Sequence, residues 1–164
     1  LYDANLMQPE FLDNGLAHNE DLLANWKAFC LAPGMAFCDF AGYHYRQHSA
    51  SASHHTLTVK ELEDNRAAAA AILDQAPDAL RQSAGAFYYE KLTYLVTRIL
   101  RLPADAALDP ILHQLTDELR RGEHDPLLGA NPILPPAVRI ASRAAVHAPW
   151  LLRAVCRLVL HDRA

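Results

Sequence analysis

Two segments of the chain combine residue types that can carry chemistry. The first is His18-Asn19-Glu20-Asp21, which directly precedes an apolar stripe that predicts a helix. The unpaired amides and the dipole at a helix start keep carboxylates ionised at neutral pH, and an ionised carboxylate can act as a general base. Adjacent helical residues point about 100° apart, so Glu20 and Asp21 cannot share one task. The alternative interpretation is that both acids only stabilise the helix start.

The second segment is Tyr-His-Tyr-Arg-Gln-His at 43–48, followed by serines and histidines up to residue 55. If residues 43–48 are extended, alternation places His44, Arg46 and His48 on one face. Phosphate oxygens can be bound by the planar guanidinium of an arginine, by an imidazole and by the hydroxyls that follow. A metal site competes with this interpretation because four histidines lie between 44 and 55, but no spacing there matches a helical His-x-x-x-His pair with a carboxylate partner. A polar surface loop is the structural alternative.

The C-terminal tail differs in charge from the rest of the chain. Residues 137–164 carry five arginines and one aspartate, a net charge of +4, whereas the preceding 136 residues carry −8. Two pairs of arginines, each four residues apart, lie beside apolar residues, as in helices that lie on anionic membranes or on acidic partners. Membrane-surface contact, subunit contact and packing against the acidic remainder of the chain are all open.

The apolar spacing predicts the elements that position these residues. A helix starts at Glu20 and ends at Pro33-Gly34, and two short strands or extended segments follow at 35–38 and 43–46. Thr58 and Glu61 have the spacing of a capping box. Further helices are expected at 58–75, 77–102, 109–122, 137–148 and 150–161. The second of these has its buried side at Leu80, Ala84, Phe87, Lys91, Leu92, Leu95, Ile99 and Leu102.

Composition limits the class of protein. The 164 residues are 51% hydrophobic, which excludes disorder and predicts one globular domain, with or without an appendage. A net charge of −4 argues against a nucleic-acid binder. Three cysteines without a CxxC spacing argue against a disulfide framework or a structural zinc site and favour a reducing cytosol. No apolar run is long enough to span a membrane. The expected fold is α+β, mostly α.

The order of these motifs resembles the C-terminal part of family-2 glycosyltransferases, which have the GT-A fold. The resemblance rests on Leu1-Tyr2, on Asn-Glu-Asp-Leu-Leu at 19–23 and on Tyr-x-Tyr-Arg-x-His-x-x-Ser-x-Ser at 43–53. It covers about residues 1–55. Because the chain begins at Leu1 rather than Met, a longer natural protein is expected.

The resemblance implies roles for five residues. Asp21 would be the general base that takes the proton from the acceptor hydroxyl, and Glu20 would orient the site. Arg46, His48 and Ser51 would close over the sugar nucleotide and stabilise charge on the leaving diphosphate. The implied reaction transfers a hexose-type sugar from a nucleotide-diphosphate sugar to a glycan or lipid-linked acceptor. The implied location is the cytoplasmic side of a bacterial envelope, as a cytoplasmic protein or one peripheral to the membrane.

The chain departs from this family in one important respect. It has no Asp-x-Asp motif and no Gly-rich turn, so the nucleotide-binding half is not represented. The divalent metal, Mg²⁺ or Mn²⁺, is therefore expected in the full-length parent, with no metal ligands in this chain, and the isolated chain is expected to be inactive. The predicted organisation is an acceptor-side GT-A piece at 1–55, a helical bundle at 56–125, a Pro-rich linker at 126–136 and a basic helical tail at 137–164.

Two functions of other classes compete with the transferase. One is a non-enzymatic helical interaction or oligomerisation domain, in which the acids cap helices and the aromatic strands support a partner surface, so that the isolated chain oligomerises or binds lipid. The other is a metal binder built on the histidine loop at 44–55.

Overall fold

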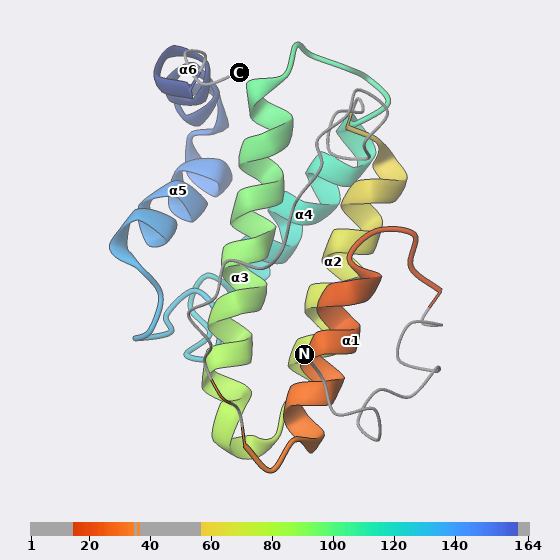
Figure 1. The fold of residues 1–164 in the computed structure, drawn as a ribbon. Helices are drawn as coiled ribbons and strands as arrows, with labels where there is room; N and C mark the ends of the chain where they lie inside the picture. The colour runs from red at the N-terminus through yellow and green to blue at the C-terminus, as the bar shows by residue number, and fades with distance from the viewer. Residues whose placement is uncertain (1–14, 35, 37–56, 161–164) are drawn as a thin grey trace.

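A computed structural model describes residues 15–34, 36 and 57–160, with the side chains of 159 and 160 left out. Helices account for most of this part of the chain. Their bounds are α1 Glu20–Leu31, α2 Val59–Asp74, α3 Asp78–Arg101, α4 Asp109–Gly122, α5 Pro136–His147 and α6 Pro149–Leu160 (Figure 1).

The helical part of the expected α+β fold is confirmed, but the short strand remnant is not seen. The described residues contain helices and turns and no strand. The strands predicted at 35–38 and 43–46 fall outside the described residues, apart from Ala36, which has no regular structure. A two-stranded ribbon is marginal without a third strand or a helix to cover it. The helical class is therefore what the structure supports.

Local signals explain where the helices begin. The amide of Glu61 donates to the Thr58 hydroxyl over 3.1 Å, which confirms one half of the predicted capping box. The Glu61 carboxylate, expected to reach back to Thr58, pairs instead with Arg98 of α3. Prolines in the first turns of α4, α5 and α6 suit the helical backbone because their missing amides would be unpaired there anyway.

The longest helix, α3, is the centre of the bundle. It contacts α2, α4, α5 and α6, and Figure 1 shows α1 and α2 on one side of it and α5 and α6 on the other. The main core includes five leucines that are completely buried, from α2, α3 and α4: Leu62, Leu92, Leu95, Leu115 and Leu119. The tail helices add Ala145, Val146, Leu152 and Cys156 to the same core. The bundle and the tail thus share one apolar interior.

The helix α1 packs against α2 at one edge of the bundle. Ala24 and Ala28 of α1 are each 1% exposed, and Ala68 and Ala69 of α2 are fully buried. Side chains this small allow two helix backbones to approach closely. A second apolar cluster, which includes Leu23 of α1, lies between α1, α2 and the start of α3. The alanine-rich interior of α2 is therefore covered by neighbouring helices.

A polar network joins three helices beside the core. Glu118 of α4 accepts hydrogen bonds from Arg66 of α2 over 3.2 Å and from the Tyr88 hydroxyl of α3. Burial, together with the hydrogen bond to the Glu118 carboxylate, raises the pKa of Tyr88 to about 12. The network fixes how α2, α3 and α4 sit relative to one another.

Gly85 of α3 makes room for the loop that follows α4. A Cβ added at Gly85 would lie 2.2 Å from the Leu127 carbonyl oxygen and 2.7 Å from Leu127 Cγ. Alanine normally stabilises a helix interior by about 1 kcal/mol relative to glycine. Here the clash with backbone outweighs that gain, so Gly85→Ala is expected to lower the free energy of unfolding by about 2 kcal/mol.

Urea unfolding of Gly85→Ala and of the exposed control Ser83→Ala measures this effect. The control is expected to stay within about 0.5 kcal/mol of the original protein. A Gly85→Ala variant that is more stable than the original would show that the loop does not press against α3.

Candidate functional site

The predicted catalytic acids lie where the sequence analysis expects them, in the first turn of α1. Asn19 precedes the helix with a left-handed backbone, at φ 60°. Asp21 is exposed, and its Oδ1 accepts a hydrogen bond from the Leu22 amide over 2.8 Å. Glu20 is half-buried. The hydrogen bond supports the helix-stabilising interpretation, while the exposure leaves the Asp21 carboxylate accessible to a ligand.

A buried aspartate holds the segment that leads into α1. Asp64 of α2 is 2% exposed, and its Oδ2 accepts a hydrogen bond from the Ala17 amide over 3.0 Å. Its other oxygen pairs with Lys60 one turn earlier. Burial by itself raises the pKa of Asp64, but the hydrogen bonds from Lys60 and Ala17 outweigh burial, and the pKa lies below its ordinary value. Asp64 therefore positions the start of α1 as an ionised carboxylate.

The stability of the protein is expected to depend on the ionisation of Asp64. Because the folded-state pKa lies below the unfolded value, the stabilisation is present above about pH 4 and is lost as the pH falls through the folded pKa. Asp64→Asn is expected to cost about 2 kcal/mol at pH 7 and to flatten the fall in unfolding free energy below pH 5.

Urea unfolding between pH 3 and 7 tests this, with Asp74→Asn as control, because Asp74 is an exposed aspartate of the same helix. The control should follow the original pH profile. An Asp64→Asn variant with an unchanged profile would show that Asp64 is not the group responsible.

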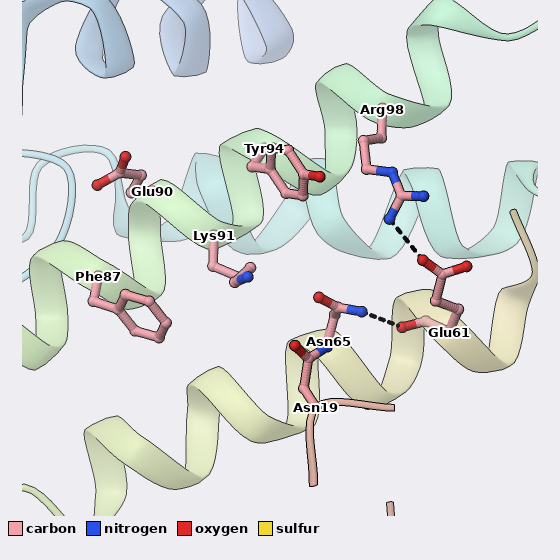
Figure 2. A pocket seen from close by; sticks show the side chains of 8 residues that line it. All are labelled: Asn19, Glu61, Asn65, Phe87, Glu90, Lys91, Tyr94 and Arg98. Carbon is pink, nitrogen blue, oxygen red and sulfur yellow. Dashed lines mark hydrogen bonds and ion pairs between the residues drawn. The ribbon is translucent and has the colours of Figure 1, made fainter. Parts of the chain in front are cut away.

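A pocket of about 500 Å³ opens between the start of α1 and the facing sides of α2 and α3 (Figure 2). Its lining combines two cations, two acids, two aromatic rings and two amides. They are Lys91, Arg98, Glu61, Glu90, Phe87, Tyr94, Asn19 and Asn65. Asn19 connects the pocket to the predicted catalytic acids, because it directly precedes Glu20.

One end of the pocket is fixed by a hydrogen bond between α2 and α3 and by a second one within α2. Arg98 Nη1 donates to Glu61 Oε1 over 2.7 Å, and the Asn65 side-chain amide donates to the Glu61 carbonyl oxygen over 2.8 Å. The Arg98 guanidinium also lies 5.9 Å from the centre of the Tyr94 ring. These contacts neutralise Arg98 and keep this end of the pocket rigid.

Lys91 is the cation of the pocket that has no ion-pair partner among the described residues. Its ammonium lies 5.8 Å from the Phe87 ring centre and 5.5 Å from the Tyr94 ring centre. No carboxylate of the described residues lies within ion-pair distance of it. Burial and the nearby Arg98 lower the pKa of Lys91, although Glu90 offsets part of this. An anionic group bound here, such as a phosphate or a carboxylate, would offset the cost of holding a charged ammonium in this partly buried position next to Arg98.

The other residues predicted to bind substrate are not placed by the structure. Arg46, His48 and Ser51 lie outside the described residues, as do the four histidines at 44–55. Within the ranges that are described, no three His, Cys, Asp or Glu side chains come together as metal ligands. The described side chains therefore offer no ligand set for a divalent cation.

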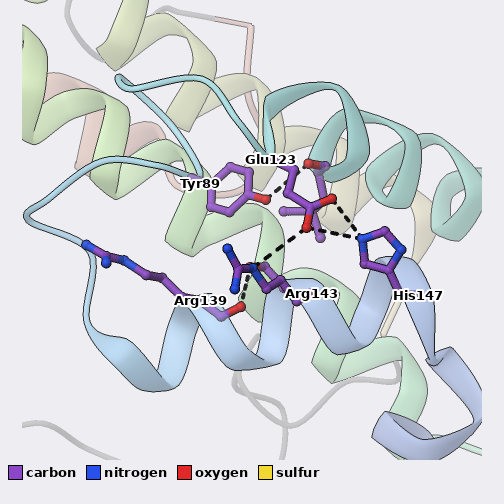
Figure 3. Close-up of polar contacts among 7 residues, drawn as sticks. Tyr89, Glu123, Arg139, Arg143 and His147 are labelled. Atoms are coloured by element: carbon purple, nitrogen blue, oxygen red, sulfur yellow. Dashed lines mark hydrogen bonds and ion pairs between the residues drawn. The ribbon is translucent and has the colours of Figure 1, made fainter.

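The basic tail is attached to the acidic part of the chain by an ionic cluster. Glu123, at the C-terminal end of α4, has a side chain that is 11% exposed. His147 Nε2 of α5 lies 2.8 Å from one of its oxygens, and Arg143 Nε lies 3.7 Å from the other (Figure 3). A carboxylate is unfavourable at the negative end of a helix dipole, and these two side chains offset that effect.

Other tail arginines bond to backbone carbonyls. Arg139 donates to the Asn131 carbonyl oxygen over 2.7 Å, and Arg157 donates to the Leu102 carbonyl oxygen over 2.9 Å. Contacts within the chain thus use part of the positive charge of the tail.

Comparisons with known proteins identify no relative. No protein-family model matches the chain, and no curated protein and no solved structure matches it significantly. Among the helices of the described ranges, none has both the length and the apolar character needed to cross a bilayer.

Proposed function

We propose that the chain is the C-terminal, acceptor-side part of a family-2 glycosyltransferase that acts at the cytoplasmic face of a membrane. The parent enzyme transfers a sugar from a nucleotide-diphosphate sugar to a glycan or lipid-linked acceptor. The observation that carries the proposal is the start of α1 at Glu20, which leaves Asp21 exposed two residues after a pocket-lining residue, Asn19. The sequence pattern at 19–23 and 43–53 supports the same function.

In this proposal, Asp21 removes the proton from the acceptor hydroxyl while the hydroxyl oxygen attacks the anomeric carbon of the donor sugar. The bond between that carbon and the diphosphate oxygen breaks, and the nucleoside diphosphate leaves. The negative charge that develops on the leaving nucleoside diphosphate is stabilised by Arg46, His48 and Ser51. Glu20 orients the site, and Asp64 is a positioning residue because it fixes the segment before α1. The divalent metal expected in the full-length parent would be held by residues other than those described, and it would neutralise further charge on the diphosphate.

The pocket favours an acceptor that carries an anionic group. Lys91 offers an ammonium without an ion-pair partner in the described residues, and Phe87 and Tyr94 offer apolar faces beside it. The phosphate of a lipid-linked acceptor matches this combination, whereas a neutral glycan leaves the charge of Lys91 unused. The pocket thus supports a lipid-linked acceptor within the proposed function.

The test is an assay of the full-length natural protein with UDP-, GDP- and dTDP-sugars in the presence of Mg²⁺ or Mn²⁺. Release of nucleoside diphosphate is measured. Glycosyltransferases hydrolyse their donor slowly when no acceptor is present, so the assay can be run before the acceptor is identified. The expected result is release from at least one donor by the full-length protein and none by the 164-residue chain. Turnover by the 164-residue chain alone, or no release from any donor by the full-length protein, would overturn the proposal.

A non-enzymatic interaction domain is the second candidate, and the shared core favours it. The main apolar core is built from α2 to α6 and includes no residue of α1, the helix that carries Glu20 and Asp21. A bundle of this kind can fold and bind a partner without a catalytic site. This candidate predicts that changes at Glu20 and Asp21 have no functional effect. It also predicts self-association of the chain, which sedimentation velocity would detect.

A further inference from the structure

The last helix exposes a continuous apolar stripe. Trp150 is 73% exposed and Leu158 is 79% exposed, and Leu151 and Val155 are each nearly half-exposed. At about 100° per residue, these four positions fall within about 140° of the helix circumference. The opposite side of α6 carries Leu152 and Cys156, which are buried in the core. One side of α6 therefore anchors it to the bundle, while the other presents large apolar side chains to the outside.

The surroundings of this stripe are basic. The segment that forms α5 and α6 contains four arginines and no aspartate or glutamate. On the helical wheel of α6, Arg157 falls directly beside the Trp150 edge of the stripe, and Arg153 falls next to Arg157. The neighbouring α5 exposes Ile140 and the Arg143 side chain. Figure 1 shows α6 at the periphery of the bundle.

We propose that the exposed face of α6 docks onto an anionic lipid surface, with Trp150, Leu151 and Leu158 entering the headgroup region. An amphipathic helix with aromatic and aliphatic residues on one face and arginines at its border is typical of helices that lie in a membrane interface. Tryptophan prefers this interface because its ring has an apolar body and a polar N–H. The arginines supply attraction to anionic headgroups.

Charge and area argue against a second copy of the chain as the occupant. A two-fold contact through this face would bring two basic tails together, and like charges oppose such a contact. A helix of this length, about 18 Å long and about 10 Å wide, offers roughly 200 Å², whereas a stable protein interface needs about 800 Å² on each partner. An amphipathic helix can bind a lipid surface through a narrow apolar stripe, because no minimum area of contact with a second folded protein is needed.

The experiment is co-sedimentation of the 164-residue chain with vesicles of 30% phosphatidylglycerol and 70% phosphatidylcholine. We expect the chain to bind these anionic vesicles at least tenfold more tightly than vesicles of pure phosphatidylcholine. Binding to the anionic vesicles should weaken when the salt concentration is raised from 0.1 to 0.5 M. The double variant Trp150→Ser/Leu158→Ser is expected to bind at least tenfold more weakly. Both side chains are exposed, so circular dichroism should show an unchanged fold.

The matched control is Phe29→Ser/Leu31→Ser, which removes two exposed apolar side chains from α1. It should bind vesicles within twofold of the original chain. The proposal would be overturned by failure of the original chain to bind anionic vesicles or by equal binding of the Trp150→Ser/Leu158→Ser variant. It would also be overturned by a dimer that this variant dissociates, because the face would then be occupied by a second copy. No sugar donor is used, so the result does not depend on the proposed transferase activity.

Discussion

Asp21→Asn is expected to lower sugar transfer by the full-length protein at least about 100-fold, because a positioned general base contributes about 10²–10⁴ to the rate. An amide cannot take up the proton that the acceptor hydroxyl must lose. The fold should be preserved, because the asparagine Oδ1 can still accept the hydrogen bond from the Leu22 amide. Since Asp21 is exposed, no buried contact is lost. The measurement is the initial rate of nucleoside diphosphate release in the presence of acceptor.

The control is Asp78→Asn, because Asp78 is also an exposed acid in the first turn of a helix, α3. If first-turn acids only stabilise their helices, the two variants should behave alike. If Asp21 is the base, Asp78→Asn keeps its activity while Asp21→Asn loses it. A loss smaller than about tenfold for Asp21→Asn, equivalent to about 1.4 kcal/mol of barrier, would remove Asp21 from this role.

The bounds of the helices were predictable because short-range signals set them. The helix predicted at 109–122 is α4, which has Pro110 in its first turn and ends at Gly122. Pro149 is the first residue of α6 and Ala148 lies between it and α5, close to the break that the sequence analysis expected between 148 and 150. Proline restricts its own backbone and removes one amide regardless of the tertiary structure, so these signals act locally.

The buried surface of α3 was predicted less well. Leu80 was expected on the buried side, but it is 41% exposed, so this prediction is wrong. Tyr89 was not included, yet it is 1% exposed and its hydroxyl donates to the Leu119 carbonyl oxygen over 3.1 Å. A search for one apolar stripe assumes that a helix is covered on one side. Four helices contact α3, so most of its circumference is buried, and a tyrosine fits there because its hydroxyl finds a partner.

The candidate site was predictable only where it depends on a helix start. The position of Asp21 in the first turn followed from neighbouring residues. The pocket beside it did not, because Lys91 and Arg98 meet Asn19 only through the packing of helices far apart in sequence. Asp64 was also missed, since a buried aspartate in an alanine-rich helix has no short-range signal for its partner, the Ala17 amide. The roles of Arg46, His48 and Ser51 stay predictions.

The Pro-rich segment 126–136 was expected to be a linker, and its most informative residue is Asn131, which is completely buried. Its side-chain amide donates to the carbonyl oxygens of Gln82 over 2.8 Å and of Leu127 over 2.7 Å. Its Oδ1 accepts from the Ile133 amide over 3.0 Å. The side chain thus joins the loop to α3, and its own carbonyl oxygen receives Arg139 of α5.

Asn131→Ala is therefore expected to lower the free energy of unfolding by about 3 kcal/mol, because it leaves buried backbone groups without partners and creates a cavity. Urea unfolding measures the loss. The control is Asn65→Ala, since Asn65 is also buried but its side chain donates one hydrogen bond within its own helix, and about 1 kcal/mol is expected there. Equal losses for the two variants would mean that residues 126–136 behave as a linker. A much larger loss for Asn131→Ala would mean that this loop fastens the basic tail, and with it α6, to the bundle.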